Sequence, residues 1–483
     1  MVKAALLAAA LVGACTDNSV TVTPIIDVPA NDSASAFPLD SITLAAAHHG
    51  AAFDITSATF TKGQAVTLGG IPFGDDLVLH MTGQVGTSEV AYGETCAFAV
   101  GQDNPPQPHL YFARTVHFGQ LAFTPLLRSG GTSVTYHDGS SIMLGGADPS
   151  DPTSSVTDVE RFDPMTGTYG ALTTISSRVD SVVGLLGLGT ETLVTIIGGV
   201  DPTTGAGATF VETVEAENPS DRRVERIDDS QLARVGLTAT TLTDGSMIVT
   251  GGRAPNGSAS AAVDEVTLMN GAPLVRPAHD VLVHARYDHT ATRLGDDVGA
   301  PVLVAGGTDG TADIAEAELF KPIIGMFSTF HPTMLYPRSR HRAVLMTDGS
   351  VLIFGGITID PMTGMPQTTD QIEIFTLDGG FKSGGVMPGN AGLLDMAVTT
   401  LPDGRVLITG GRRTVTGPPL ATAFIAQLNT DTNSIDVLAT DSMTVPRAGH
   451  SATLLCDGTV VISGGTTQPA AAERYNPPSA ARR

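Results

Sequence analysis

One stretch of sequence recurs along this chain and limits the possible fold more than any other feature. In residues 240–252, TTLTDGSMIVTGG, a short apolar run leads to Asp-Gly, and a second apolar run ends in two glycines. Seven copies can be recognised, with the first glycines spaced by 49 to 55 residues. The glycine pairs are Gly145-Gly146, Gly198-Gly199, Gly251-Gly252, Gly306-Gly307, Gly355-Gly356, Gly410-Gly411 and Gly464-Gly465. A period near 50 built from short strands and turns is typical of a propeller rather than a helical array.

The residue types within each copy predict a β-hairpin. Asp-Gly, present in five of the seven copies, supplies the positive φ of a tight two-residue turn. The paired glycines have no Cβ, so they allow unusual backbone angles and close approach of a neighbouring chain segment. The first run of each copy is rich in Ala, Thr, Ser and Val, which suit an innermost strand where blades converge on an axis.

Two charged residue types recur in phase with the glycine pairs. A glutamate holds one place in five segments that we interpret as third strands: Glu160, Glu215, Glu318, Glu373 and Glu473. An arginine lies 17 or 20 residues before the first glycine in six copies: Arg128, Arg178, Arg234, Arg286, Arg338 and Arg447. These side chains are expected to tie loops to strands by hydrogen bonds, because they recur where the loops differ. The alternative is that they line a polar channel, and the six arginines are therefore candidates for a binding face.

The repeat resembles the kelch family. The matching elements are Pro-Arg-x-x-His at 337–341 and 446–450, the Asp-Gly hairpin, the Gly-Gly pair and the Glu-aromatic-x-Pro strand, in phase over residues 115–478. Known kelch domains are propellers of four-stranded blades. The resemblance therefore implies an all-β fold, a seven-bladed kelch-type β-propeller preceded by a small β-sandwich domain. The chain has no tryptophan, whereas many kelch repeats carry one in the fourth strand.

The sequence divides into four predicted regions: a signal peptide at 1–14, a lipidated tether at 15–40, a small β-sandwich at 41–113 and the propeller at 114–483. Val12-Gly13-Ala14-Cys15 follows an apolar segment and resembles the lipobox of bacterial lipoproteins. Cys15 is then the lipidation site, and the protein is exported to the cell envelope, to the outer membrane in our prediction. The last copy ends after its third strand, so residues 115–123 are expected to supply the missing outer strand.

Composition excludes some functions and leaves others open. The chain has 49 acidic and 26 basic residues, a net charge of −23, which argues against a nucleic-acid partner and against docking by charge on an anionic membrane. We expect a monomer that contacts the membrane only through its lipid. Cys96 and Cys456 fall in different predicted domains. A disulfide is possible there, but two buried thiols are the favoured expectation.

The search for catalytic residues starts from galactose oxidase, which also has seven kelch-like blades. Its copper is held by two tyrosines and two histidines, with a tyrosine–cysteine crosslink. Tyr136-His137 is the one Tyr-His pair in the sequence, and it precedes an Asp-Gly turn, as Cys456 does in copy seven. The sequence does not reproduce the full set, so no catalytic residue, metal or cofactor is expected. A metal at His279, His284 and His289, or calcium at the three Asp-Pro-x-x-Gly segments that begin at Asp163, Asp201 and Asp360, is disfavoured against a structural or turn role.

Function is therefore expected to depend on the surface. The loops after the glycine pairs vary most, and variable loops on a rigid repeat scaffold suit binding. The leading hypothesis is a lipid-anchored envelope protein whose propeller is a non-catalytic scaffold for a protein or glycan ligand. The alternative is a galactose-oxidase-like or other carbohydrate-active enzyme that uses the same face, and a third possibility is a mostly structural surface protein. Small and apolar residues at the axis favour a binder, whereas a convergent His/Tyr or carboxylate cluster favours an enzyme.

The lipid anchor gives a direct prediction. Only the thiol of Cys15 can carry the acyl chains, so Cys15→Ser should move the protein from the membrane fraction to the soluble fraction, measured by fractionation and by mass spectrometry of the mature N-terminus. A Ser variant that still sediments with lipid, together with an unacylated Cys15 in the original protein, would show the lipoprotein assignment to be wrong.

Overall fold

The computed structural model describes residues 19–32, 38–61, 63–101, 106–149, 151–216, 224–228, 232–360, 362–467 and 469–481. The signal peptide and Cys15 lie outside these residues. The described chain is almost entirely β-structure, with short 3₁₀ helices at Gly189–Glu191, Pro322–Ile324 and Ser479–Ala481. None of its helices has both the length and the apolar character needed to cross a bilayer.

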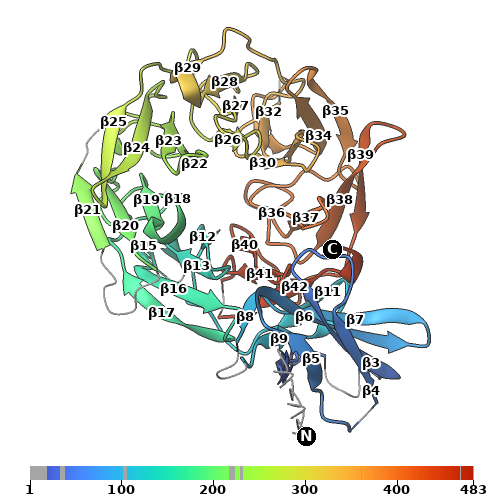
Figure 1. The fold of residues 1–483 in the computed structure, drawn as a ribbon. Coiled ribbons are helices and arrows are strands. Elements are labelled where there is room, and N and C mark those ends of the chain that lie inside the picture. Colours follow the sequence, from blue (N-terminus) through green and yellow to red (C-terminus); the bar gives the residue numbers. More distant parts are fainter. Residues whose placement is uncertain are drawn as a thin grey trace, which may run out of the picture.

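Seven four-stranded antiparallel sheets within the described residues lie in a ring around a central opening (Figure 1). We number them by their order along the chain and give the innermost strand first. Sheet 1 contains β12 (Thr132–Thr135), β13 (Ser141–Leu144), β16 (Asp158–Asp163) and β17 (Thr168–Thr174). Sheet 2 contains β18 (Val182–Leu186), β19 (Leu193–Ile197), β20 (Phe210–Val214) and β21 (Val224–Asp228). Sheet 3 contains β22 (Thr238–Thr241), β23 (Met247–Thr250), β24 (Val263–Met269) and β25 (Ala272–Pro277). Sheet 4 contains β26 (Thr290–Arg293), β27 (Val302–Ala305), β28 (Glu318–Lys321) and β29 (Met326–Phe327). Sheet 5 contains β30 (Arg342–Leu345), β31 (Val351–Phe354), β34 (Gln371–Thr376) and β35 (Gly380–Val386). Sheet 6 contains β36 (Ala397–Thr400), β37 (Val406–Thr409), β38 (Ala423–Asn429) and β39 (Ser434–Ala439).

Sheet 7 joins the two ends of the ring. It contains β40 (Ser451–Leu454), β41 (Val460–Ser463), β42 (Glu473–Asn476) and β11 (His117–Gln120). β11 pairs antiparallel with β42, with His117 opposite Asn476 and Gln120 opposite Glu473. The expectation that residues 115–123 supply the outer strand of the last sheet is therefore confirmed. The pairing leaves no unpaired strand edge between the first and last sheets.

The Asp-Gly turns differ in type from the two-residue turn expected from the sequence. At the first of them, Gly139 N donates to Tyr136 O and Tyr136 N donates to Ser140 O. Gly139 has φ 80°, whereas Asp138 has no positive φ. This is a type I turn followed by a left-handed glycine, the arrangement of a three-residue hairpin loop. The Asp138 carboxylate accepts a hydrogen bond from Ser140 N at 2.8 Å, which explains why aspartate is used here.

The glycine pairs lie where neighbouring sheets meet. Gly306 has φ 63°, and a Cβ there would come within 2.5 Å of Arg338 O and 2.6 Å of His341 Cε1, both in the segment that enters the next sheet. Gly307 has φ 87°, and its Cβ would come within 2.7 Å of Tyr287 O, in the segment that enters its own sheet. The first glycine thus leaves room for the segment that leads into the next sheet, and the second leaves room for the segment that leads into its own sheet. Both glycines are therefore needed for close packing of the ring.

A buried ion pair holds six of the seven sheets to the segment that enters them. The six recurring arginines are at most 4 % exposed and each pairs with an acid of the third strand that is at most 3 % exposed. The pairs are Arg128–Glu160, Arg178–Glu212, Arg234–Asp264, Arg286–Glu318, Arg338–Glu373 and Arg447–Glu473. The expected role of tying loops to strands fits these contacts.

The pairs correct two details of the sequence analysis. The acid of sheet 2 is Glu212, not Glu215, because the third strand is β20 at Phe210–Val214 rather than the segment 214–219. The acid of sheet 3 is Asp264, which a search for glutamate misses. In sheet 6 the arginine position is Leu393 and the acid position is Phe424, opposite Ile408. Both residues belong to one apolar cluster, so an apolar pair replaces the ion pair there.

The N-terminal residues form a separate β-unit beside sheet 7 (Figure 1). Its main sheet runs β10 (Ala113–Arg114), β7 (Ser88–Glu94), β6 (Gly74–Val85), β3 (Ser41–His48), β4 (Thr56–Phe60), with β8 (Phe98–Val100) also on β6. Two further pairs are β1 (Ser19–Val22) with β5 (Leu68–Pro72) and β2 (Ile25–Asp27) with β9 (His109–Tyr111). Val22 and Ile71 of the small pairs pack in the same apolar core as the main sheet.

The strands β1 and β2 contradict the prediction of a tether over residues 15–40. Val20 pairs with Ile71 and Ile26 with Leu110, so this part of the chain belongs to the N-terminal unit. Asp32 is also buried and accepts hydrogen bonds from Arg114 N at 2.9 Å and Arg114 Nε at 2.5 Å.

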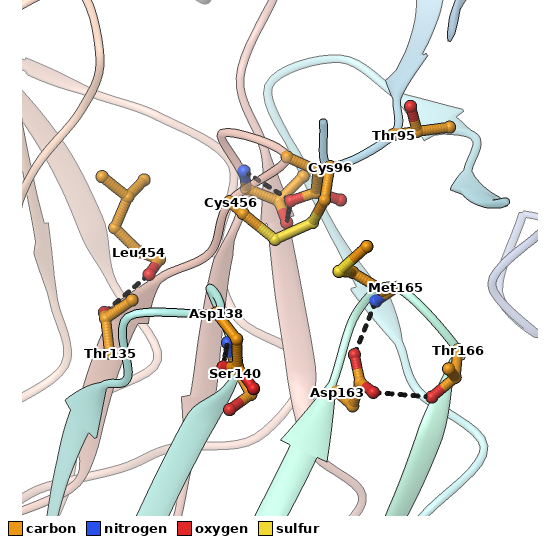
Figure 2. The surroundings of a disulfide bond; sticks show 12 residues. Thr95, Cys96, Thr135, Asp138, Ser140, Asp163, Met165, Thr166, Leu454 and Cys456 are labelled. Atoms are coloured by element: carbon orange, nitrogen blue, oxygen red, sulfur yellow. Dashed lines mark hydrogen bonds between the residues drawn. A yellow bond between two sulfur atoms is a disulfide. The ribbon is translucent and has the colours of Figure 1, made fainter. Parts of the chain in front are cut away.

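A disulfide joins the N-terminal unit to the ring. Cys96 and Cys456 are bonded across a sequence separation of 360 residues, with their Cα atoms 5.0 Å apart (Figure 2). The favoured expectation of two free thiols is therefore wrong. Asn476 reinforces the junction, since its buried Nδ2 donates to Tyr92 O at 2.9 Å and to Ala113 O at 2.8 Å. Two further two-stranded sheets are separate from the seven sheets of the ring. They are β14 (Ala147–Asp148) with β15 (Asp151–Ser155), and β32 (Ile357–Ile359) with β33 (Pro366–Thr368).

The apolar pair of sheet 6 predicts how the ionic pairs respond to mutation. Arg338→Leu alone leaves Glu373 buried without its partner and should lower the free energy of unfolding by about 3–5 kcal/mol. The double change Arg338→Leu/Glu373→Phe copies Leu393 and Phe424 and should cost less than either single change. Urea unfolding of the three variants measures this, and a double-mutant loss equal to the sum of the single losses would contradict it.

Candidate binding site at the ring axis

A cavity of about 610 Å³ opens at the centre of the ring. Its wall includes the first residue of every innermost strand. These residues are Thr132, Val182, Thr238, Thr290, Arg342, Ala397 and Ser451. Six of the seven are small or uncharged because wedge-shaped sheets converge here, and Arg342 is the exception.

Above this wall lies a rim of residues in the left-handed conformation. Each lies two positions after the recurring arginine, or after Leu393 in sheet 6, and all have φ between 54° and 68°: Gly130, Asp180, Gly236, Asp288, Arg340, Asp395 and Gly449. Backbone hydrogen bonds join neighbouring members, among them Asp288 N to Gly236 O and Arg340 N to Asp288 O, both 2.8 Å. The left-handed conformation costs roughly 1–2 kcal/mol in a residue with a side chain. The rim therefore carries charged side chains at positions where glycine would be less strained.

The charges of the rim are of both signs. Arg340 Nη2 lies 2.7 Å from Asp395 Oδ1, and Arg412 Nε lies 3.7 Å from Asp395 Oδ2. Burial raises the pKa of the Asp288 carboxyl, and the nearby Arg340 and Arg253 oppose that rise. The rim thus presents carboxylate acceptors and guanidinium donors around one small opening.

Three histidines also line the cavity and are largely buried. The Nε2 atom of His289 lies 2.9 Å from Thr250 Oγ1, that of His341 lies 2.9 Å from Thr290 Oγ1, and that of His450 lies 2.8 Å from Thr409 Oγ1. Burial, with a smaller contribution from nearby arginines, lowers the pKa of His341 and of His450 to about 3. These side chains are neutral at pH 7 and have a structural role.

The other candidates from the sequence do not converge on the axis. The six recurring arginines lie beneath the face, paired with acids, so their guanidinium groups are not at its surface. Tyr136 is in the hairpin of sheet 1 and its hydroxyl donates to Thr192 O at 2.7 Å. Asp163 and Asp360 accept hydrogen bonds from the backbone two residues on, each at 2.8 Å, as turn residues do. No group of three His, Cys, Asp or Glu side chains suited to a metal occurs among the described residues.

The variable loops share the face of the axial rim. Isolated bridges join the segment after five of the six recurring arginines, and after Leu393 in sheet 6, to the loop after the glycine pair of the same sheet. They include Ser129 with Ala147, Val235 with Arg253 and Tyr287 with Thr308. The predicted placement of loops and inter-sheet segments on one face is therefore correct. The rim itself was missed in the sequence, although a charged or glycine residue two positions after each arginine was the available signal.

Comparison with known proteins gives a likeness in fold. No protein-family description matches the sequence, and no curated protein does. Among solved structures, the chain is similar to a fungal alcohol oxidase of the AA5 family in complex with copper. The two align with a TM-score of 0.53 and 15% identity, over 75% of this chain and 76% of the oxidase. This supports an all-β, propeller-like fold of the galactose oxidase kind.

The described residues do not fit a copper site of the tyrosine–histidine kind. No tyrosine lines the axial cavity, and the Nε2 atoms of the three nearby histidines contact threonine hydroxyls. Cys96 and Cys456 are bonded to each other, so neither is available for a crosslink to tyrosine. The chain shares the fold of the oxidase without its expected ligand set in the described residues.

The buried histidines predict a loss of stability in acid. In the unfolded chain a histidine has a pKa near 6.5, whereas His341 and His450 have pKa values of about 3 when folded. The unfolded state therefore binds more protons as the pH falls from about 6.5 towards 3, and the free energy of unfolding should fall by about 1.4 kcal/mol per pH unit for each histidine. Urea unfolding at pH 6, 5 and 4 should show a shallower slope for His450→Gln than for the original protein. The same change at exposed His49 is the control, and equal slopes in all three proteins would contradict the assignment.

Proposed function

We propose that this protein is a non-catalytic glycan-binding propeller. In this proposal the seven sheets are the blades of a kelch-type β-propeller, the chain is exported to a bacterial envelope, and lipid on Cys15 holds it at the outer membrane. The repeat in phase with the glycine pairs supports the kelch assignment, and the lipobox-like Val12–Cys15 segment supports the anchor. The observation that carries the binding function is the axial cavity, with its wall of small residues and its rim of mixed charge.

The dimensions and chemistry of the cavity favour a glycan over a protein surface. A volume of about 610 Å³ is within the range of small-molecule pockets and can admit a sugar unit, whereas a folded partner could contact only the surrounding loops. Asp288, Arg340 and Asp395 offer carboxylate acceptors and guanidinium donors, which match the paired hydroxyls of a saccharide. The strands behind them are fixed by the ring, so the site is largely preformed and costs little ordering on binding.

An oxidase is the second candidate, and the likeness to a copper-containing alcohol oxidase is the observation in its favour. It requires copper bound at the axis in an arrangement different from the tyrosine–histidine set. Copper analysis of the purified chain after incubation with Cu²⁺ and a peroxide-release assay with galactose distinguish the two functions. Stoichiometric copper together with turnover would replace the binding proposal by the oxidase.

A glycan array tests the binding proposal. We expect the full exported chain to bind a subset of glycans, and Thr132→Trp, which fills the cavity from the wall, to weaken that binding at least about tenfold. Thr174→Trp places the same side chain on an exposed position of the outer strand of sheet 1 and is the matched control. Binding that survives Thr132→Trp, or no glycan binding by a folded protein, would refute the proposal.

A further inference from the structure

We propose that the glycan carries a single negative charge, as a uronic acid does, and that Arg342 receives its carboxylate. This inference rests on the proposed function and adds the ligand class and the receiving residue. Arg342 is the first residue of β30 and the charged member of an otherwise uncharged ring of seven wall residues. Its position is therefore central to the cavity rather than on the outer surface.

The Arg342 side chain is held at its stem and open at its end. Nε donates to Met396 O at 3.1 Å, across the junction with the next sheet. The residue is exposed to solvent, yet burial lowers the pKa of its guanidinium. Both findings agree if the side chain reaches into a solvent-filled cavity that protein surrounds. Since Arg342 lines the cavity, its guanidinium is the cationic donor group that a ligand there could reach.

Arg342 differs from its neighbours in having no ion-pair partner among the described residues. The nearest acid to act on it, Asp395, is already bound by Arg340 and lies near Arg412. At the other end of the innermost strands, Arg293 pairs with Asp296 at 2.6 Å. A cation without a partner in partly desolvated surroundings is unfavourable, and a planar guanidinium binds a carboxylate through two parallel hydrogen bonds. The arrangement therefore suits an anion that enters the cavity from outside.

The rim limits the charge of that anion. Of the rim residues that line the cavity, Asp288 and Asp395 are acidic and Arg340 is basic, and the whole chain has a net charge of −23. A polysulfated or polyphosphorylated ligand would be repelled along its length. A sugar with one carboxylate can place that group on Arg342 while its hydroxyls contact the rim acids. This selects a monoanionic sugar acid among acidic ligands.

Ligand-observed NMR titration of the full exported chain tests the inference with methyl glucuronide, its neutral twin methyl glucoside, and acetate. The original protein should bind the glucuronide about tenfold more tightly than the glucoside, as expected for one charge-assisted bidentate contact. Arg342→Met should remove this preference, measured as the ratio of the two affinities, and Arg342→Lys should retain part of it. Arg405→Gln, on the Asp-Gly turn of sheet 6, is the arginine control and should retain all of it.

The outcomes separate this inference from the proposed function. Equal binding of both glycosides, abolished by Thr132→Trp, would refute the anion site and leave glycan binding standing. Binding of neither glycoside, with an empty glycan array, would refute both. Acetate that binds as tightly as the glucuronide would refute the sugar acid as the ligand. The melting temperature of Arg342→Met serves as the folding check and should stay close to that of the original protein, because the change removes an unpaired cation together with one hydrogen bond, from Nε to Met396 O.

Discussion

The ring depends on the contact that each sheet makes with the chain segment entering it. In six sheets that contact is an arginine whose guanidinium reaches a third-strand acid and, in most of them, a glycine carbonyl; Arg338, for example, donates to Gly355 O at 3.0 Å and to Glu373 at 3.1 Å. The acid also accepts a backbone N–H from the incoming segment, as Glu373 does from Leu335 at 2.6 Å. Because each guanidinium is paired with an acid and also donates to backbone carbonyls, the buried charges are tolerated. In sheet 6 Leu393 and Phe424 take these two positions within one apolar cluster, so the junction does not require an ion pair.

The same contact positions the candidate site. Two residues beyond each arginine the backbone turns through the left-handed region and forms the rim, and the next residues begin the innermost strand that forms the wall. The position of the buried arginine therefore determines where the rim residue and the innermost strand of each sheet lie. Different side chains can then occupy these positions without altering the backbone, as Asp180, Asp288, Arg340 and Asp395 do beside three glycines. A repeat built for packing in this way provides a set of independently variable positions around one cavity.

The N-terminal unit and sheet 7 form one connected structure. β11 leaves the N-terminal unit and pairs with β42, and the disulfide joins Cys96 to the β40–β41 turn. Asn476 also donates to three backbone carbonyls of that unit. A link across 360 residues restricts the unfolded chain strongly. The N-terminal unit is therefore attached to the ring at sheet 7, the sheet in which the two ends of the ring pair. The unit thus has a structural role in closing the ring.

The sequence by itself determined the repeat, the hairpin that opens each sheet, the glycine junctions and the closing strand, because these follow from local periodicity and turn chemistry. It also pointed to the arginines and to most of their acids. Only the tertiary structure decided that Glu212 rather than Glu215 is the partner in sheet 2, because strand register determines which side chain faces the arginine. Tertiary structure also decided the disulfide, since contact between residues 360 positions apart leaves no local pattern. The axial site depends most on it: residues such as Asp288, Arg342 and Asp395 are separated by a full repeat in sequence and come together only when the ring closes.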